Sequence, residues 1–385
     1  MLLKPSFTGG ARYYLEKYAD AMAVVRALGH PALFINFTCN PNWKEIHEAL
    51  LPQQSSHDRP DIVARVFHLK LKQLLTELTT DGVFGKCTGH VATIEFQKRG
   101  LQHVHILLFL KSASRQQSAD VYDRYISAAI PSDAANQTLR TSVLRHMVHG
   151  PCVGHNPVVP CVQPDGTCSK YYPRDFAPQS VDGKGPYPMY RRRLPEEGGQ
   201  RATPSHPGVM TEIDNQWIGP YSPYLMSVFD CHCSVEICSN VRAVKFLIKY
   251  VCKGPDRAMV RIVRTGEQGG DAEEAEQQQP IDEIQVFFEA RFIGDSEAAW
   301  RTLTSDMVYH FPAVMKLAVH LKNEQPVYFD DGGEEAAVSG PARDTTLIAF
   351  FNLNSAPGDY IEPAADTLLY ADVPGFFAWQ QRTRK

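Results

Sequence analysis

The 385-residue sequence has no uninterrupted apolar stretch long enough to cross a membrane, and it begins without a charged-then-apolar leader. It also has no Gly-x-x-x-x-Gly-Lys-Ser/Thr segment, the loop that cradles nucleotide phosphates in many ATPases. No internal repeat of solenoid length is present. The pattern excludes a membrane-spanning protein and a P-loop ATPase, and it predicts an intracellular globular protein.

The chain also has no excess of basic over acidic residues. The chain has 39 Lys and Arg against 43 Asp and Glu, a formal net charge of −4 and a pI near 6.4. Nucleic-acid-binding proteins usually carry a basic excess or a basic face. Here the charges are unevenly placed, with acidic clusters at 271–276 and 330–335 and basic runs at Lys98-Arg99 and Arg191-Arg192-Arg193. The arginine run fits a phosphate-binding face and a solvated surface equally well.

Nine cysteines, an odd number, argue for reduced thiols or metal ligands and against a disulfide framework. No paired Cys-x-x-Cys of a zinc ribbon is present, but one Pro-rich segment holds His149, Cys152, His155, Cys161 and Cys168. The three thiols with either histidine could form a four-ligand structural zinc site. The alternative is a loop whose cysteines are buried small hydrophobic residues. For Cys231 and Cys233 we expect core packing, with His232 a weaker candidate for an active site.

The segment from Thr93 to Leu110 has the pattern of an apolar hairpin. Strand side chains alternate with period two, so His103 and His105 project to the same side. Glu95 and Gln97 share a face of the preceding strand, and the residues that follow form a turn. A metal site of both histidines with Glu95, or alternatively Gln97, is one interpretation. Core filling by a lone His-x-His is the other.

Residues 243–256 have the pattern of a helix that stops at Gly254-Pro255. Its apolar stripe consists of Val244, Leu247, Ile248 and Val251. Tyr250 and Lys253 lie three residues apart and therefore share a face, where the ammonium favours a phenolate or binds a phosphate. An amphipathic surface helix with a partly buried tyrosine is the alternative.

Taken in order, these motifs resemble the Helitron helicase-like domain, the replication-initiator nuclease portion of Helitron rolling-circle transposases, within the His-hydrophobic-His endonucleases. The matching segments are Phe37-Thr38-Cys39-Asn40-Pro41-Asn42-Trp43, Asp58-Arg59-Pro60-Asp61, Arg65-Val66-Phe67, residues 95–105, His149-Gly150-Pro151-Cys152, Asp214-Asn215-Gln216-Trp217, the tyrosine helix and Glu297-Ala298-Ala299-Trp300-Arg301. The family pattern has two tyrosines four residues apart, each followed three residues later by Lys. Here Phe246 stands at the first position, with Lys249 still in place, which leaves Tyr250 alone.

The resemblance implies a nuclease whose metal, Mg²⁺ or Mn²⁺, is held by Glu95, His103 and His105. It implies attack by Tyr250, assisted by Lys253, on single-stranded DNA of the transposon ends. The residues expected to bind DNA are Lys98, Arg99, Lys249, Arg191, Arg192 and Arg193. The aromatic residues Tyr171, Tyr172, Tyr187 and Tyr190 could stack on bases beside them, and the alternative for each of these rings is packing in the core. A longer polyprotein would supply a helicase domain, and the site of action would be the nucleus.

Two rival functions remain open. One is a decayed transposon-derived domain that binds DNA without nicking it, as Phe246 suggests. The other is a zinc-stabilised interaction module.

We predict an α+β fold with a central antiparallel sheet and flanking helices of replication-initiator nuclease type, a Pro/Cys-rich insertion and a C-terminal α/β extension. The expected elements are helices over 12–28, 60–78 and 296–309 and strands over 32–38, 91–96, 104–110 and 227–237. The predicted domain boundaries are 1–112 and 211–265 for the two halves of the nuclease domain, 113–210 for the elaboration, 266–280 for a disordered linker and 281–385 for the extension.

Overall fold

The computed structural model describes residues 7–8, 10–96, 100–111, 119–132, 136–150, 152, 159–181, 188–204, 211–238, 293–303, 306–322, 324–325, 335, 344–355 and 367–378. The predicted tyrosine helix and the predicted linker 266–280 lie outside these residues. The chain divides into two compact units, 1–312 and 313–385. The finer domain boundaries stay a prediction.

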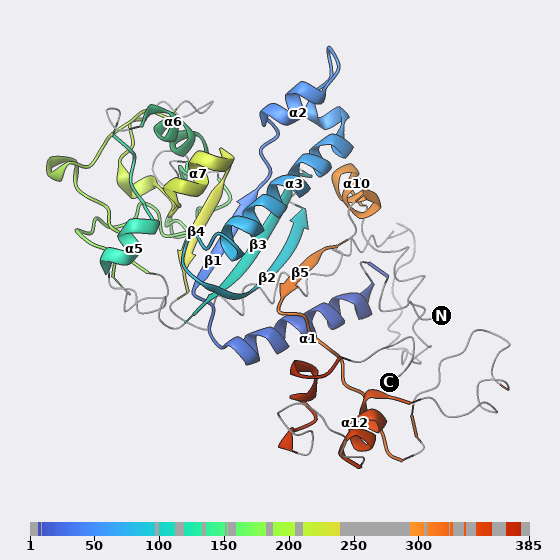
Figure 1. The fold of residues 1–385 in the computed structure, drawn as a ribbon. Coiled ribbons are helices and arrows are strands. Elements are labelled where there is room, and N and C mark those ends of the chain that lie inside the picture. Colours follow the sequence, from blue (N-terminus) through green and yellow to red (C-terminus); the bar gives the residue numbers. More distant parts are fainter. Residues whose placement is uncertain are drawn as a thin grey trace, which may run out of the picture. The chain divides into compact units, whose positions relative to one another are not determined.

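Among the described residues, five strands form one sheet in the order β4-β1-β3-β2-β5 (Figure 1). They are β1 (Leu33–Thr38), β2 (Cys87–Phe96), β3 (Gln102–Leu110), β4 (Cys233–Ile237) and β5 (Val308–Phe311). All neighbouring strands are antiparallel. The strand with the two histidines, β3, is central and every one of its residues is buried. The predicted α+β fold with a central antiparallel sheet is thereby confirmed.

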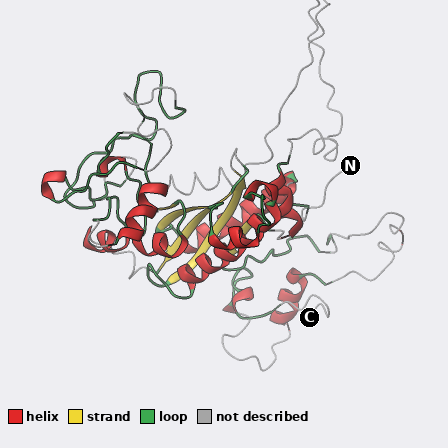
Figure 2. Ribbon diagram, turned by 90° about the horizontal axis from the view of Figure 1, so that it is seen from above, coloured by secondary structure: helices red, strands yellow, loops and turns green. Residues whose placement is uncertain are grey.

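Helices surround this sheet in the first unit (Figure 2). They are α1 (Ala11–Leu28), α2 (Lys44–Ala49), α3 (Pro60–Thr79), α5 (Ala119–Tyr125), α6 (Gln137–His146), α7 (Pro223–Phe229) and α10 (Asp295–Leu303). Proline at the start of α3 suits a position whose N–H has no helical partner. Its buried residues recur every three or four positions, as a helix on a sheet requires: Val63, Ala64, Phe67, Leu71, Leu74 and Leu78.

The apolar core lies between one sheet face and α3, and α10 closes it. Phe37 of β1 stacks against Phe67 of α3 at a ring-centroid distance of 5.6 Å. Trp300 of α10 meets the Phe67 ring edge-on at 5.7 Å and donates its indole N–H to the Asp306 carbonyl over 3.0 Å. Trp300 is fully buried, so a helix far along the chain completes the core of the N-terminal sheet.

Replacing Trp300 with Ala is expected to lower the free energy of unfolding by about 3–5 kcal/mol, because a fully buried aromatic ring leaves a cavity. The matched control is Leu303→Ala, on the same helix but 39% exposed, which should cost well under ~1 kcal/mol. Urea denaturation measures both. Equal losses for the two variants would contradict this account of the core.

Two predicted elements were wrong in extent. The run 227–237 was expected as a strand, but α7 continues to Phe229 and β4 begins only at Cys233. Asp230 ends the helix in the left-handed conformation, with φ of 41°, and this turn redirects the chain into the sheet. Cys231 and Cys233 are fully buried, which confirms their packing role.

The second correction concerns the predicted helix 296–309. The helix α10 ends at Leu303, and Tyr309 belongs to β5, where it pairs with Ala92 of β2. Pairing with the open edge of β2 outweighs the helical pattern, since it satisfies backbone groups that would otherwise have no partner. Strand β2 also begins earlier than predicted, at Cys87, and passes through Gly89. A Cβ there would clash with the Leu28 side chain and the Phe311 carbonyl oxygen.

The second unit contains one described α-helix, α12 (Thr346–Ser355), and a short 3-10 turn, Val373–Gly375. Tyr370 ties them to the preceding segment, because its hydroxyl donates to the Ala318 carbonyl over 2.9 Å and its ring lies 5.1 Å from that of Phe350. Within the described residues, no helix of either unit combines the length and apolarity needed to cross a membrane.

Candidate functional site

One face of the sheet carries polar side chains at its centre. Antiparallel pairing sets His105 opposite Asn36 and His103 opposite both Thr38 and Glu95. Directly paired residues point to the same face, so the structure brings Glu95, His103 and His105 together on the side away from α3. This arrangement follows from the period-two pattern that the sequence shows.

Each histidine is held through its Nδ1 atom. His105 Nδ1 lies 2.5 Å from Asn36 Oδ1, and Asn36 Nδ2 donates to Ser234 Oγ over 3.0 Å. His103 Nδ1 lies 2.6 Å from the Thr38 hydroxyl. The two imidazole rings are 4.5 Å apart at an angle of 77°. Side chains from β1 and β4 therefore orient both rings and leave each Nε2 atom for another partner.

The partner of His105 Nε2 is the Glu95 carboxylate, with Oε2 at 3.1 Å. With Asn36 Oδ1 accepting from Nδ1–H, the neutral ring has a lone pair on Nε2, and the carboxylate oxygen also offers only lone pairs. A proton or a metal cation is needed between two such acceptors. One carboxylate with two imidazoles is a donor set of the kind that suits Mg²⁺ or, with its nitrogen ligands, Mn²⁺.

His103 has the protonation state that a metal ligand needs. Burial, together with the neighbouring His105 and His232, lowers its pKa to about 3. The ring is thus neutral at physiological pH, the form in which imidazole ligates metals. Thr38 also reaches His232, whose Nδ1 lies 3.4 Å from the same hydroxyl.

The supporting residues Asn36 and Thr38 were missed as functional groups in the sequence. They occupy alternate positions of an otherwise apolar strand, Leu33-Phe34-Ile35-Asn36-Phe37-Thr38. Polar residues spaced by two in such a strand indicate a polar site on one sheet face.

A second candidate site lies in the Cys-rich segment. The ligand atoms of His149, Cys152, Cys161 and Cys168 all lie within 4.8 Å of one another. The sulfur atoms of Cys152 and Cys168 are 3.6 and 3.4 Å from His149 Nε2. A zinc tetrahedron with ordinary bond lengths separates sulfur and nitrogen ligands by about 3.5 Å. The spacing therefore matches a structural zinc site. Glu95, His103 and His105 are not gathered this tightly: among the described residues, no other set of three or more His, Cys, Asp or Glu is.

Backbone pairing builds the cluster. His149 follows a bridge between Val148 and Ile218, and a second bridge joins Val162 to Cys168. Gly166, with φ of 79°, makes the turn that returns the chain from Cys161 to Cys168. Burial disfavours the Cys168 thiolate, but hydrogen bonds from the N–H groups of Tyr172 and Lys170 and from the Cys152 and Cys161 thiols together lower the pKa of this thiol. Burial raises the pKa of Cys152 to about 12. A thiolate is the form that binds zinc.

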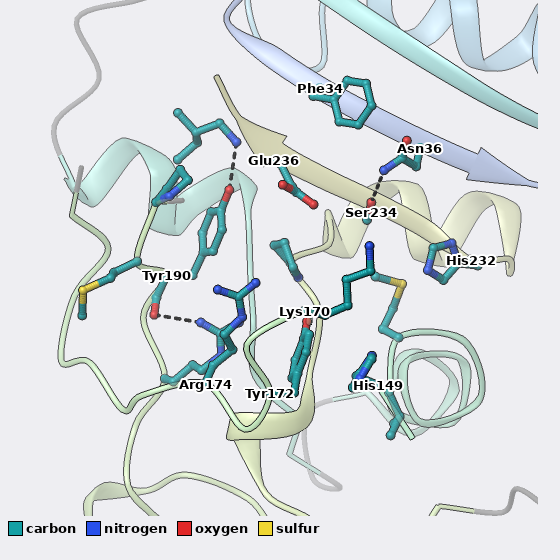
Figure 3. Close-up of a pocket in the computed structure, with 18 of the residues that line it drawn as sticks. Phe34, Asn36, His149, Lys170, Tyr172, Arg174, Tyr190, His232, Ser234 and Glu236 are labelled. Atoms are coloured by element: carbon teal, nitrogen blue, oxygen red, sulfur yellow. Dashed lines mark hydrogen bonds between the residues drawn. The ribbon is translucent and has the colours of Figure 1, made fainter. Parts of the chain in front are cut away.

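A pocket of about 630 Å³ lies between the β4 and β1 edge of the sheet and the Cys-rich segment (Figure 3). From the sheet, Asn36, Ser234 and Glu236 line it; from the Cys-rich segment, Lys170 and Arg174 do. Figure 3 shows Glu236 and Lys170 entering the same space from opposite walls.

The arginine run does not form a single face. Arg192 is 4% exposed and lines the pocket, donating to the Ile218 carbonyl over 3.0 Å. Arg191 lies 3.5 Å from the Asp123 carboxylate, and Arg193 is exposed. The remaining predicted site residues lie outside the described part of the chain: Gln97, Lys98, Arg99, His155, Tyr187, Phe246, Lys249, Tyr250 and Lys253.

The similarity found to known proteins lies in the first 108 residues of the chain. No curated protein matches the sequence. Residues 1–108 match the family model described as the Helitron helicase-like domain at the N-terminus. The matched range contains β1, β2 and nearly all of β3, and with them Glu95, His103 and His105. The resemblance drawn from the sequence motifs is confirmed over this range, where the chain is similar to the Helitron helicase-like N-terminal domain.

Proposed function

We propose that this protein is a metal-dependent tyrosine endonuclease and strand transferase that acts on single-stranded DNA in Helitron-type rolling-circle transposition. The observation that carries the proposal is the grouping of Glu95 with His103 and His105 on the central strands. It supports a nuclease because this donor set lies inside the Helitron-like segment and fits a divalent ion. A DNA partner follows from the family.

Glu95, His103 and His105 would hold the Mg²⁺ or Mn²⁺ ion. When bound, such an ion supplies polarisation of the scissile phosphate. Asn36 and Thr38 are positioning residues, since they fix the ring orientations through Nδ1. Partners of this kind keep the ligand nitrogen pointed at its ion.

Tyr250 is the proposed nucleophile, on the strength of the family pattern. Its phenol oxygen attacks phosphorus and loses its proton while the bond from phosphorus to the 3′-oxygen breaks and that oxygen gains a proton. The products are a 5′-phosphotyrosine and a free 3′-hydroxyl. A free phenol has a pKa of about 10 and is a weak nucleophile at neutral pH, so Lys253 is proposed to stabilise the negative charge that develops.

The wider proposal includes the basic residues and the cellular setting. Lys98, Arg99, Lys249 and Arg191 to Arg193 would contact the DNA. A helicase domain would come from a longer polyprotein, and the reaction would occur in the nucleus. These parts rest on the family alone.

The test is covalent capture on labelled single-stranded DNA with Mn²⁺ or Mg²⁺, followed by a denaturing gel. We expect a labelled band at the mass of the protein plus the DNA fragment. The second candidate function, a decayed domain that binds DNA without nicking, is favoured by Phe246 at the first tyrosine position. Binding without any covalent band would select that alternative.

The Cys-rich cluster is proposed to hold a structural zinc ion. Purified protein should contain about one zinc per chain by elemental analysis. Changing Cys161 to Ser removes one ligand and should abolish zinc retention and lower the melting temperature. The matched control is Cys87→Ser, a half-buried thiol outside the cluster. A protein that folds fully in chelator without zinc would favour simple packing of the cysteines.

A further inference from the structure

The 630 Å³ pocket lies next to the candidate site of Glu95, His103 and His105. Asn36 lines the pocket and also holds His105, and Ser234 lines it while accepting from Asn36. Phe34, another lining residue, stacks on the His105 ring at 5.7 Å. A strand of substrate that reaches the histidines would therefore place a neighbouring nucleotide at the pocket.

The lining combines three kinds of group. Lys170, Arg174 and Arg192 are cationic, Phe34 and Tyr172 are aromatic, and Glu236 is a carboxylate from β4. Cationic side chains bind phosphates. Bases stack on aromatic rings and on guanidinium planes, and a carboxylate accepts hydrogen bonds from the edges of bases. The volume also falls within the range of ordinary small-ligand sites, about 300–1,000 Å³.

The Cys-rich cluster, which is the proposed zinc site, forms one wall of this pocket. Both His149 and Cys161 belong to the lining. The His149 ring stacks on Tyr172 with centroids 4.2 Å apart and planes 14° from parallel, and the Arg174 guanidinium carbon lies 5.1 Å from the same Tyr172 ring. A zinc ion that fixes His149 would thereby fix the position of Arg174.

Glu236 interacts electrostatically with Lys170 and Arg174. Burial raises the pKa of its carboxyl group, while Arg174 and Lys170 act in the opposite direction. The carboxylate is thus close enough to both cations to feel their charge. A ligand that offers a phosphate to the cations and a hydrogen-bond donor to the carboxylate would satisfy all three groups.

We propose that this pocket binds one nucleotide of the single-stranded DNA next to the scissile phosphate, with its phosphate at Lys170 and Arg174 and its base edge at Glu236. The inference rests on the proposed function, whose DNA it places. Glu236 selects a base with an exocyclic amino group, because a carboxylate accepts from cytosine N4 and is repelled by the carbonyl oxygen that thymine presents at the same position.

Binding can be measured separately from cleavage. The probes are fluorescein-labelled oligo(dC) and oligo(dT) of about 12 nucleotides, titrated with the zinc-containing protein without added Mg²⁺ or Mn²⁺ and followed by anisotropy. We expect Lys170→Ala and Arg174→Ala each to weaken binding about fivefold and to reduce the salt slope by about one. The matched controls are Lys72→Ala and Arg65→Ala, exposed cations of α3 on the opposite side of the sheet.

Glu236→Gln provides the test of base choice. The unmutated protein should bind oligo(dC) several times more tightly than oligo(dT), and the variant should lose that preference without a change in melting temperature. Lys170 is exposed, so its variant remains informative even if Arg174→Ala fails to fold.

The outcomes separate this inference from the nuclease proposal. Cleavage by the unmutated protein with unchanged affinity and salt slope in Lys170→Ala would overturn the pocket assignment alone. Pocket-dependent binding without any covalent band would overturn the nuclease proposal and keep the pocket. Equal affinity of the unmutated protein for oligo(dC) and oligo(dT) would refute the role of Glu236.

Discussion

Changing Tyr250 to Phe is expected to eliminate all covalent protein–DNA adduct while leaving the affinity for single-stranded DNA nearly unchanged. The substitution removes one oxygen, the atom that would bond to phosphorus, and keeps the ring. Phe246, four residues earlier in the sequence, has no hydroxyl and cannot replace it. Denaturing gels of labelled DNA with Mn²⁺ measure the adduct, and anisotropy measures the affinity.

The reverse change, Phe246→Tyr, is the companion experiment. Lys249 stands three residues beyond Phe246, as Lys253 does beyond Tyr250, so the variant is expected to gain a second acceptor tyrosine. Adduct formation by the double variant Phe246→Tyr, Tyr250→Phe would show that the phenol introduced at position 246 is an acceptor. Adduct that persists in Tyr250→Phe alone would show that another residue is the nucleophile.

Replacing both His103 and His105 with Ala is expected to abolish Mn²⁺ binding at this site in calorimetry and to reduce cleavage by more than about 100-fold. Loss of a group that only supports a ligand costs about 10–100-fold, and here two of three ligands are lost. The control is His47→Ala, an exposed histidine of α2. Unchanged Mn²⁺ affinity in the double variant would remove this site from consideration.

Because both histidines are buried, the double variant needs a check of its melting temperature. Glu95→Gln avoids the problem, since it keeps the side-chain volume and removes only the charge. We expect it to lose most cleavage. Full cleavage by Glu95→Gln, together with loss in Gln97→Ala, would exchange the two residues as the third ligand.

Local sequence pattern determined the α+β fold, the two main helices and the common face of the two histidines. The helix of 60–78 and the strands around Thr93 to Leu110 carry strong periodicity, and each buries its apolar face against the other. Period two alone dictates that His103 and His105 share a face. The prediction that they share a metal site with Glu95 rests on the same periodicity.

Only tertiary structure decided which distant residues meet. The partners of the histidines, Asn36 and Thr38, come from a strand about 70 positions earlier, with separations of 69 and 65 residues. The strand that ends in Phe311 pairs with β2 across more than 200 residues of sequence. Hydrogen bonding between strand edges sets such pairings, and no local periodicity encodes them.

The same reason explains the Cys-rich segment and the pocket. The spacing of Cys152, Cys161 and Cys168 is irregular, so the sequence left the histidine open between His149 and His155, and chain folding brings His149 to the thiols. Lys170 and Glu236 are 66 residues apart in sequence and meet across one pocket. Sequence determines which chemical groups are available, whereas backbone pairing between remote segments decides which of them share a site.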